Sequence, residues 1–164
     1  MLSSLNLKYS IVGHSERRQY HKETDEMIFN KAKQLLKSNM SPIYCCGELL
    51  EDRKSENHYK VVASQLQPLL DNLNSDELEK FIIAYEPVWS IGTGLIPKSD
   101  DLLNSISFIK NKFLKKTPKV LYGGSVNAKN IAQLKDISVI DGFLIGGASQ
   151  SSKKFIDIIK KTFN

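Results

Sequence analysis

The sequence has few of the residues that mark a secreted or metal-binding protein. Among 164 residues there are two cysteines, Cys45 and Cys46, and they are adjacent in the chain. A disulfide between neighbours would be strained, and no spacing typical of a metal site is present. We therefore expect two reduced thiols in a cytosolic protein.

Long apolar runs are also missing. No stretch approaches the roughly 18 apolar residues of a membrane-spanning helix, and the residues after Met1 do not follow a signal-peptide pattern. The composition, with 41% hydrophobic and 25% charged residues, is that of an ordinary globular protein. We expect a soluble, cytoplasmic protein without membrane partners.

Arginine is scarce, and most of the 23 basic residues, set against 18 acidic ones, are lysines. The lysines are scattered over helix-patterned segments, and aromatic residues do not alternate with them. This pattern indicates solvated helix faces, so no nucleic-acid partner is expected. The net charge of +5 would still favour encounter with a phosphorylated small molecule.

What the chain does contain is a regular alternation of short apolar runs and longer amphipathic segments. Strands are predicted at 9–13, 42–46, 81–85, 120–122 and 142–145. Ser99 is the predicted N-cap of the third long helix, because Asp100 and Asp101 would then lie in its first turn. A short helix is predicted near 130–134. The apolar faces of the four longer helices carry, in chain order, Ile28, Ala32, Leu35 and Leu36; Val62, Leu66, Leu69, Leu70 and Leu73; Leu102, Ile106, Ile109 and Phe113; and Phe155, Ile156, Ile159 and Phe163.

Apolar strands that alternate with amphipathic helices predict an α/β fold of parallel βα units in a single domain, 1–164. Five such units fit either an open doubly wound sheet or part of a barrel, and periodicity does not choose between them. A complete (β/α)8 barrel needs about 250 residues.

Residues able to do chemistry follow four of the predicted strands. His14 follows the first and Glu86 the third, and glycine-rich turns at 122–125 and 146–149 follow the last two. Taken alone, His14 reads more simply as a helix cap, Glu86 equally well as an ion-pair partner, and a glycine pair as a turn. Because the carboxyl ends of parallel strands meet at one edge, their combination favours a functional site.

The two glycine-rich turns indicate a phosphate site. Turns without side chains let backbone N–H groups approach an anion, and a following helix N-terminus adds a favourable dipole. The segment 91–94 (IGTG) is not a dinucleotide fingerprint, because Pro97 stands where the third glycine would be. NAD is therefore rejected as a cofactor.

These motifs, with their surroundings, resemble the triosephosphate isomerase family. The segment 13–18 (GHSERR) is similar to the family's electrophile loop, and 84–94 (AYEPVWSIGTG) to its catalytic base and closing lid. The segments 122–126 (YGGSV) and 144–149 (LIGGAS) resemble its phosphate loops, and 45–48 (CCGE) its turn after strand five. The motifs occur in the family's order over essentially the whole chain.

The resemblance implies a partial TIM (β/α)8 barrel, strands four to eight, without the first three. It also implies interconversion of dihydroxyacetone phosphate and D-glyceraldehyde 3-phosphate in glycolysis and gluconeogenesis. Glu86 would move a proton between neighbouring carbons through an enediol, and His14, held neutral, would polarise the carbonyl. No cofactor or metal is implied, and the family forms homodimers.

The resemblance also assigns the binding residues. Backbone N–H groups of four residues would hold the phosphate of the triose substrate: Gly92, Ser125, Gly146 and Gly147. Residues 87–94 would close over the substrate and exclude water. Supporting roles fall to Ser15 and Glu16, which would begin a helix behind His14, and to Ile91 and Tyr122.

The chain departs from the family pattern in its lid and at its start. Ser90 replaces the usual alanine, and 95–97 (LIP) replaces a small, flexible hinge, so lid motion would differ. The family's first strand supplies an Asn-x-Lys motif. Residues 6–8 (NLK) match this motif in sequence. Lys8, however, begins the strand that ends at His14, and six strand residues span about 20 Å. Lys8 therefore belongs to the opposite edge of the sheet.

Without that lysine, we expect this chain alone to be a weak or inactive isomerase. The alternative is a non-catalytic, phosphate-binding half-barrel that needs a complementing chain. A third interpretation, another phosphate-binding barrel enzyme, would not require His14 and Glu86 in these contexts.

Overall fold

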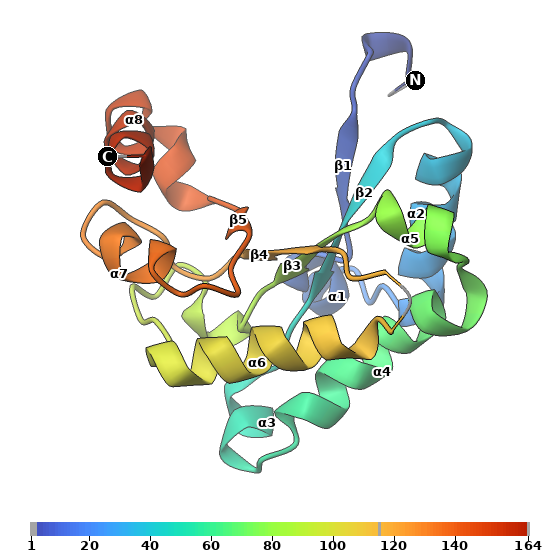
Figure 1. Ribbon diagram of the computed structural model, residues 1–164, viewed down its shortest axis with the longest axis horizontal. Helices are drawn as coiled ribbons and strands as arrows, with labels where there is room; N and C mark the ends of the chain where they lie inside the picture. Colours follow the sequence, from blue (N-terminus) through green and yellow to red (C-terminus); the bar gives the residue numbers. More distant parts are fainter. Residues whose placement is uncertain (1–2, 115, 164) are drawn as a thin grey trace.

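Five parallel strands form one sheet in the computed structural model, which describes residues 3–114 and 116–163 (Figure 1). They are β1 (Tyr9–Val12), β2 (Ser41–Cys46), β3 (Ile82–Tyr85), β4 (Lys119–Tyr122) and β5 (Gly142–Phe143). The helices are η1 (Ser3–Leu5), α1 (Ser15–Tyr20), α2 (Asp25–Lys37), α3 (Leu50–Lys54), α4 (His58–Asn72), α5 (Ser75–Glu79), η2 (Val88–Ser90), α6 (Ser99–Lys112), α7 (Ile131–Lys135), η3 (Gly147–Gln150) and α8 (Ser152–Phe163).

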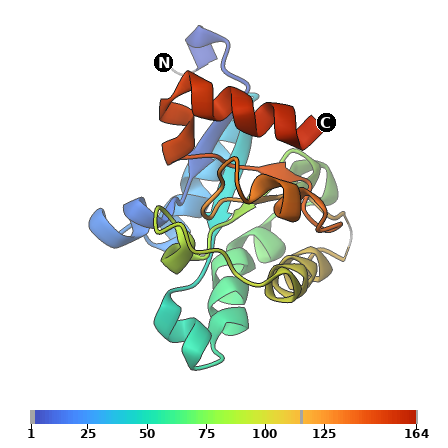
Figure 2. The ribbon, with the colours of Figure 1, turned by 90° about the vertical axis from the view of Figure 1, so that its left-hand side faces the viewer.

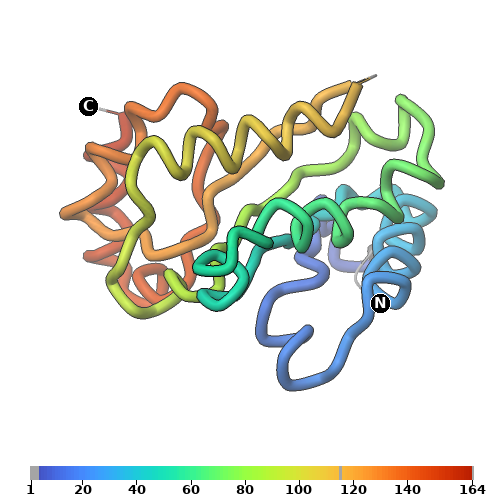
Figure 3. The backbone as a smooth tube through the Cα atoms, turned by 90° about the horizontal axis from the view of Figure 1, so that it is seen from below, coloured from blue at the N-terminus to red at the C-terminus, as the bar shows by residue number. Residues whose placement is uncertain are grey.

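The strand order settles which parallel fold this is. The strands neighbour one another in the order β1-β2-β3-β4-β5, the order of the chain. A doubly wound sheet reverses its strand order at a switch point, whereas a barrel keeps it. The sheet is therefore an arc of a TIM barrel, and it is not closed: β1 and β5 lie at its two open edges (Figures 1 and 3).

The core lies between one face of the sheet and its helices. Val12, Tyr44, Ile83 and Val120 stand side by side on neighbouring strands, and all four are buried. Helices α2, α4 and α6 cover this face, with α4 packed between the other two. Such burial of apolar surface contributes about 25 cal/mol per Å².

The opposite face of the sheet is less covered. The next row of paired residues is Ile11, Ile43, Ile82 and Lys119; Ile11 is 47% exposed, and the two other isoleucines are partly buried. In a closed barrel this face would line the interior, where side chains from all strands fill the centre. The open arc leaves these side chains partly in solvent.

The predicted elements are all present, with shifted boundaries. The last strand is only Gly142–Phe143 instead of 142–145; residues 144–146 lie between it and η3, and the Leu144 N–H still donates to the Tyr122 carbonyl at 3.0 Å. Ser99 was predicted as the N-cap of α6, and this is wrong: Ser99 is the first helical residue, Lys98 is the N-cap, and no side chain caps the helix. The Ser99 hydroxyl instead accepts a hydrogen bond from the Gln133 side chain at 3.1 Å.

Helix α8 differs from expectation in the side that it buries. Its predicted apolar face consisted of Phe155, Ile156, Ile159 and Phe163, but these side chains are 36–83% exposed. Ile158 is the residue of α8 that is buried, at 1% exposure. Helix α8 contacts α7 and η3, and it lies across the β5 end of the sheet (Figure 2). Its broad apolar face therefore borders an open edge.

Among the described residues, no helix has the length and apolar character needed to cross a membrane. The cysteines Cys45 and Cys46 are free and buried, and burial raises the pKa of both thiols.

The helix layer can be tested at α6. Ile106→Ala deletes a fully buried side chain, so we expect a loss of about 2–5 kcal/mol in the free energy of unfolding, measured with urea. Leu103→Ala, on the same helix but 41% exposed, is the matched control and should cost well under half as much. Equal losses for the two variants would contradict the packing described here.

Candidate functional site

The chemically distinctive residues meet at the carboxyl edge of the sheet. A cavity of about 470 Å³ lies there. It is lined by seven of the residues predicted for the site: His14, Glu86, Ile91, Gly92, Ser125, Gly146 and Gly147. The structure therefore brings together residues that are up to 133 positions apart in the sequence, from Gly147 back to His14.

His14 and Glu86 face each other across this edge. The Nε2 atom of His14 lies 3.6 Å from Oε1 of Glu86. The imidazole is 32% exposed, whereas the carboxylate is 3% exposed. A buried carboxylate beside a partly exposed imidazole is suited to proton transfer between neighbouring atoms of a small ligand.

The local sequence fixes the orientation of His14. Gly13 adopts a φ of +73°, and an added Cβ would lie 2.8 Å from the Ile28 side chain, so the sharp turn out of β1 needs glycine. His14 is then the N-cap of α1, with its Nδ1 accepting the N–H of Glu16 at 3.3 Å. An accepting Nδ1 carries a lone pair, so the proton of the neutral ring lies on Nε2, which faces Glu86. The prediction that Ser15 and Glu16 begin a helix is confirmed.

Burial is the main influence on Glu86. Loss of solvent raises the pKa of its carboxyl, while His14, the Cys45 thiol and the Ser15 N–H act in the opposite direction. The Ser15 N–H donates to Oε2 at 3.3 Å. Gly123 leaves room for the side chain, because a Cβ there would lie 2.9 Å from Cγ of Glu86. A carboxylate with a raised pKa is a stronger base than a solvated one.

The segment after Glu86 is docked against the cavity at two points. The Trp89 indole N–H donates to Glu48 at 3.2 Å, and Glu48, which is fully buried, also accepts the Tyr85 hydroxyl at 3.0 Å. At the other end of the segment, the Gly94 N–H donates to the Ser125 hydroxyl at 3.0 Å. These contacts hold residues 88–94 over the glycine-rich turn that follows β4.

The predicted phosphate donors differ in availability. Gly146 and Gly147 line the cavity and are exposed, and open space surrounds the position of a Cβ at either. Gly92 has the same open surroundings. The Ser125 N–H, in contrast, already donates to the Ser90 hydroxyl at 3.2 Å. In the part of the chain that the structure describes, an anion would find three glycine N–H groups without a hydrogen-bond partner and one, that of Ser125, which it must share.

Sequence reasoning assigned no role to three residues at the site. Glu48 anchors Trp89, and Asn127 and Lys154 line the cavity. Among the described residues that line it, Lys154 is the single lysine or arginine. It lies in the lysine-rich α8, where the sequence offers no signal that separates it from its neighbours. Lys8 precedes β1 and lies at the opposite edge from His14, as predicted.

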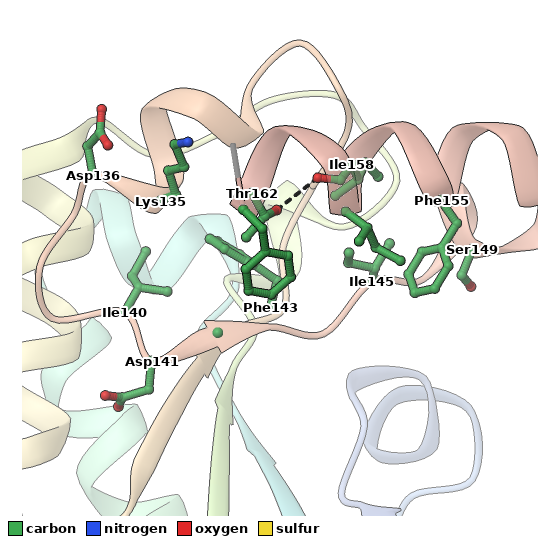
Figure 4. A pocket seen from close by; sticks show the side chains of 13 residues that line it. Lys135, Asp136, Ile140, Asp141, Phe143, Ile145, Ser149, Phe155, Ile158 and Thr162 are labelled. Atoms are coloured by element: carbon green, nitrogen blue, oxygen red, sulfur yellow. Dashed lines mark hydrogen bonds between the residues drawn. The ribbon is translucent and has the colours of Figure 1, made fainter.

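A larger cavity, about 600 Å³, lies elsewhere, between β5 and α8 (Figure 4). Its lining is mostly apolar, with Phe143, Ile145 and Phe155 in the space between the end of β5 and the helix (Figure 4). Among the described residues that line it, no acid and base lie within reach of each other as Glu86 and His14 do in the smaller cavity. Size alone therefore does not identify the site.

The raised pKa of Glu86 predicts a specific dependence of stability on pH. The native state holds the Glu86 proton more tightly than the unfolded state does. Protonation of Glu86 therefore stabilises the fold below the ordinary glutamate pKa of 4.5, and this stabilisation is lost as pH rises through the folded pKa. Glu86→Gln should therefore be more stable than the parent at pH 7, with a difference that shrinks towards pH 4. Urea unfolding across this range measures it.

The exposed Glu51→Gln is the control for that series, and it should show no comparable difference. A Glu86→Gln variant whose stability tracked the parent at every pH would contradict a buried, high-pKa carboxylate.

Comparison with known proteins shows the family of the chain. The family model described as triosephosphate isomerase matches residues 1–162. The triosephosphate isomerase of Amoebophilus asiaticus is 42% identical over 98% of this chain and 66% of its own length. Those of Ruthia magnifica and Finegoldia magna are 40% and 43% identical, over 67% and 66% of their lengths. The chain thus spans about two thirds of the length of these relatives, and it belongs to the triosephosphate isomerase family.

Proposed function

We propose that the chain carries the catalytic edge of a triosephosphate isomerase, an intramolecular aldose–ketose isomerase acting on dihydroxyacetone phosphate and D-glyceraldehyde 3-phosphate. The observation that carries the proposal is the 3.6 Å approach of His14 Nε2 to the buried carboxylate of Glu86. Residues 1–164 would form one incomplete barrel domain, working in the cytoplasm, in glycolysis and gluconeogenesis, and as a homodimer like the family.

In this proposal, Glu86 removes a proton from the carbon next to the substrate carbonyl. The C–H electron pair forms the carbon–carbon double bond of an enediolate as the carbonyl π pair moves onto oxygen, and that oxygen takes a proton from Nε2 of His14 to give an enediol. Nε2 then removes the hydroxyl proton on the first carbon. The O–H electron pair forms the new carbonyl, and the double-bond pair takes the Glu86 proton onto the neighbouring carbon. A neutral imidazole suits this role, because Nε2 gives up one proton and regains one within the cycle, so the ring ends in its starting state.

The phosphate would bind at the glycine-rich end of the cavity. Gly92, Gly146 and Gly147 offer N–H groups without side chains in the way, and Lys154 adds a positive charge at the rim. Ile91 lines the same cavity, and Tyr122 lies beneath the turn that carries Ser125. The docked segment 88–94 would exclude water from the enediolate.

We further expect slow turnover by this chain alone. Negative charge develops on the carbonyl oxygen, and each 1.36 kcal/mol of missing stabilisation costs a factor of about ten in rate. Among the described residues lining the cavity, Lys154 is the one fixed positive charge, and it lies on an exposed helix. The alternative function is a half-barrel that binds phosphate without turnover, which these same N–H groups would support.

The proposal is tested by the exchange of carbon-bound hydrogen for deuterium in dihydroxyacetone phosphate, followed by NMR in deuterated water. This assay detects proton removal even when net isomerisation is slow. Glu86→Gln should reduce the exchange rate by about 10²–10⁴, the usual contribution of a general base. Glu51→Gln is the matched control and should exchange like the parent.

Binding of inorganic phosphate without any exchange above background would instead favour the half-barrel. Exchange that survived Glu86→Gln unchanged would refute the assignment of the base.

Lys154 gives a second prediction. Lys154→Ala should weaken binding of inorganic phosphate by a factor of about two to five, the range for an exposed charge, and the effect should shrink as salt is added. Lys153→Ala is the matched control, because this neighbouring lysine does not line the cavity. Calorimetric titration of both variants measures the difference, and equal losses would mean that only the net charge matters.

A further inference from the structure

Ser90, the residue that departs from the family's alanine, lies at the junction of the docked segment and the sheet. It ends η2 and is fully buried. Its hydroxyl oxygen lies 2.6 Å from the carbonyl oxygen of Leu95, 2.9 Å from the Tyr122 hydroxyl and 3.2 Å from the Ser125 nitrogen. One side chain thus contacts the far end of its own segment, the end of β4 and the turn after β4.

The hydrogen-bonding capacity of a hydroxyl matches these three contacts. Ser90 has one proton to donate and two lone pairs to accept. Its proton goes to Leu95, whose carbonyl can only accept, and its lone pairs receive the Ser125 N–H and the Tyr122 hydroxyl. Tyr122 is able to donate, because burial raises its pKa to about 12 and keeps the phenol protonated. No donor or acceptor of Ser90 is left unused.

A second hydrogen bond runs in the reverse direction between the same two segments. The Ser125 hydroxyl accepts the Gly94 N–H at 3.0 Å, while the Ser125 N–H donates to Ser90. Ser125 is therefore hydrogen-bonded to both ends of the segment 90–94. Pro97, just beyond, has no N–H, so it offers no backbone donor for such a contact.

We propose that Ser90 is a positioning residue of the lid: its hydroxyl fixes residues 88–95 against the turn 122–125, so that the N–H group of Gly92 is held towards the same phosphate as those of Gly146 and Gly147. The inference rests on the proposed function, because it names how that site is held closed. An alanine at this position would leave the Leu95 carbonyl and the Ser125 N–H without their partner. The lid would then dock less firmly.

A competing interpretation makes the opposite prediction. The Ser90 hydroxyl occupies the Ser125 N–H, so it could compete with a phosphate for that donor. Removing the hydroxyl would then tighten phosphate binding. The geometry favours positioning, because two of the three contacts, those to Leu95 and Tyr122, do not involve any N–H that the phosphate would use.

The test uses Trp89, the single tryptophan of the chain, which lies within the lid. In Ser90→Ala, acrylamide should quench the Trp89 fluorescence more strongly than in the parent. Binding of glycerol 3-phosphate, a phosphate ester without a reactive carbonyl, should weaken about tenfold, as expected for about 1.4 kcal/mol of lost hydrogen bonding. Tyr122→Phe should shift both quantities in the same direction but less. The double variant should lose less than the sum, because both changes break the same contact.

Thr162→Val is the matched control: it removes a hydroxyl that donates to Ile158 within α8, far from the lid, and should leave Trp89 quenching unchanged. Unchanged quenching and affinity in a folded Ser90→Ala variant would overturn the proposal, and tighter binding would establish competition instead. The deuterium-exchange assay separates this result from the proposed function. If Ser90→Ala changes Trp89 quenching and affinity but the parent does not catalyse deuterium exchange, the isomerase proposal alone is refuted. If the parent catalyses exchange but Ser90→Ala changes neither quantity, the role of Ser90 alone is refuted.

Discussion

The burial of one carboxylate beside one imidazole is the constraint around which the described part of the chain is arranged. Glu86 is 3% exposed, and an ionised group at that depth is costly unless neighbours compensate it. The compensation comes from three elements: His14 at the start of α1, the Ser15 N–H, and the Cys45 thiol at the end of β2. Each depends on the parallel register that brings β1, β2 and β3 to one edge.

This part of the site could be predicted because it depends on short motifs at strand ends. Because His14, Glu86 and the two glycine turns all follow parallel strands, the topology of the sheet places them at the same edge. The strand order was not predictable from periodicity, since a doubly wound sheet and a barrel share the same alternation of elements. Only the resemblance favoured the barrel, and the consecutive order of β1 to β5 decides it.

The errors fall where the sequence pattern is local but the outcome depends on distant neighbours. Serine is a residue type that often caps helices, yet the Ser99 hydroxyl accepts a hydrogen bond from Gln133, a residue of α7. The apolar residues of α8 have regular helical spacing, yet Ile158 is buried while Phe163 is 83% exposed, because the helix borders an open edge. Lys154 and Glu48 were given no role for a similar reason. Lys154 is one of several lysines in α8, and Glu48 is a glutamate after a strand, so the role of each depends on the distant residues that lie opposite it in the fold.

The lid illustrates how a substitution in a backbone-based site can act. Phosphate binding through N–H groups leaves little for side chains to contribute directly, so they act by fixing where the N–H groups point. In the proposed site, Trp89 would perform this role through its hydrogen bond to Glu48 at one end of the lid, and Ser125 through its hydrogen bond to Gly94 at the other. Ser90 supports the second of these contacts, because its hydroxyl accepts the N–H of Ser125. An alanine lacks this connection, so the serine adds polar contacts at a place where the stiffer residues 95–97 follow the lid. Firm docking and slow opening would then be two consequences of the same hydroxyl.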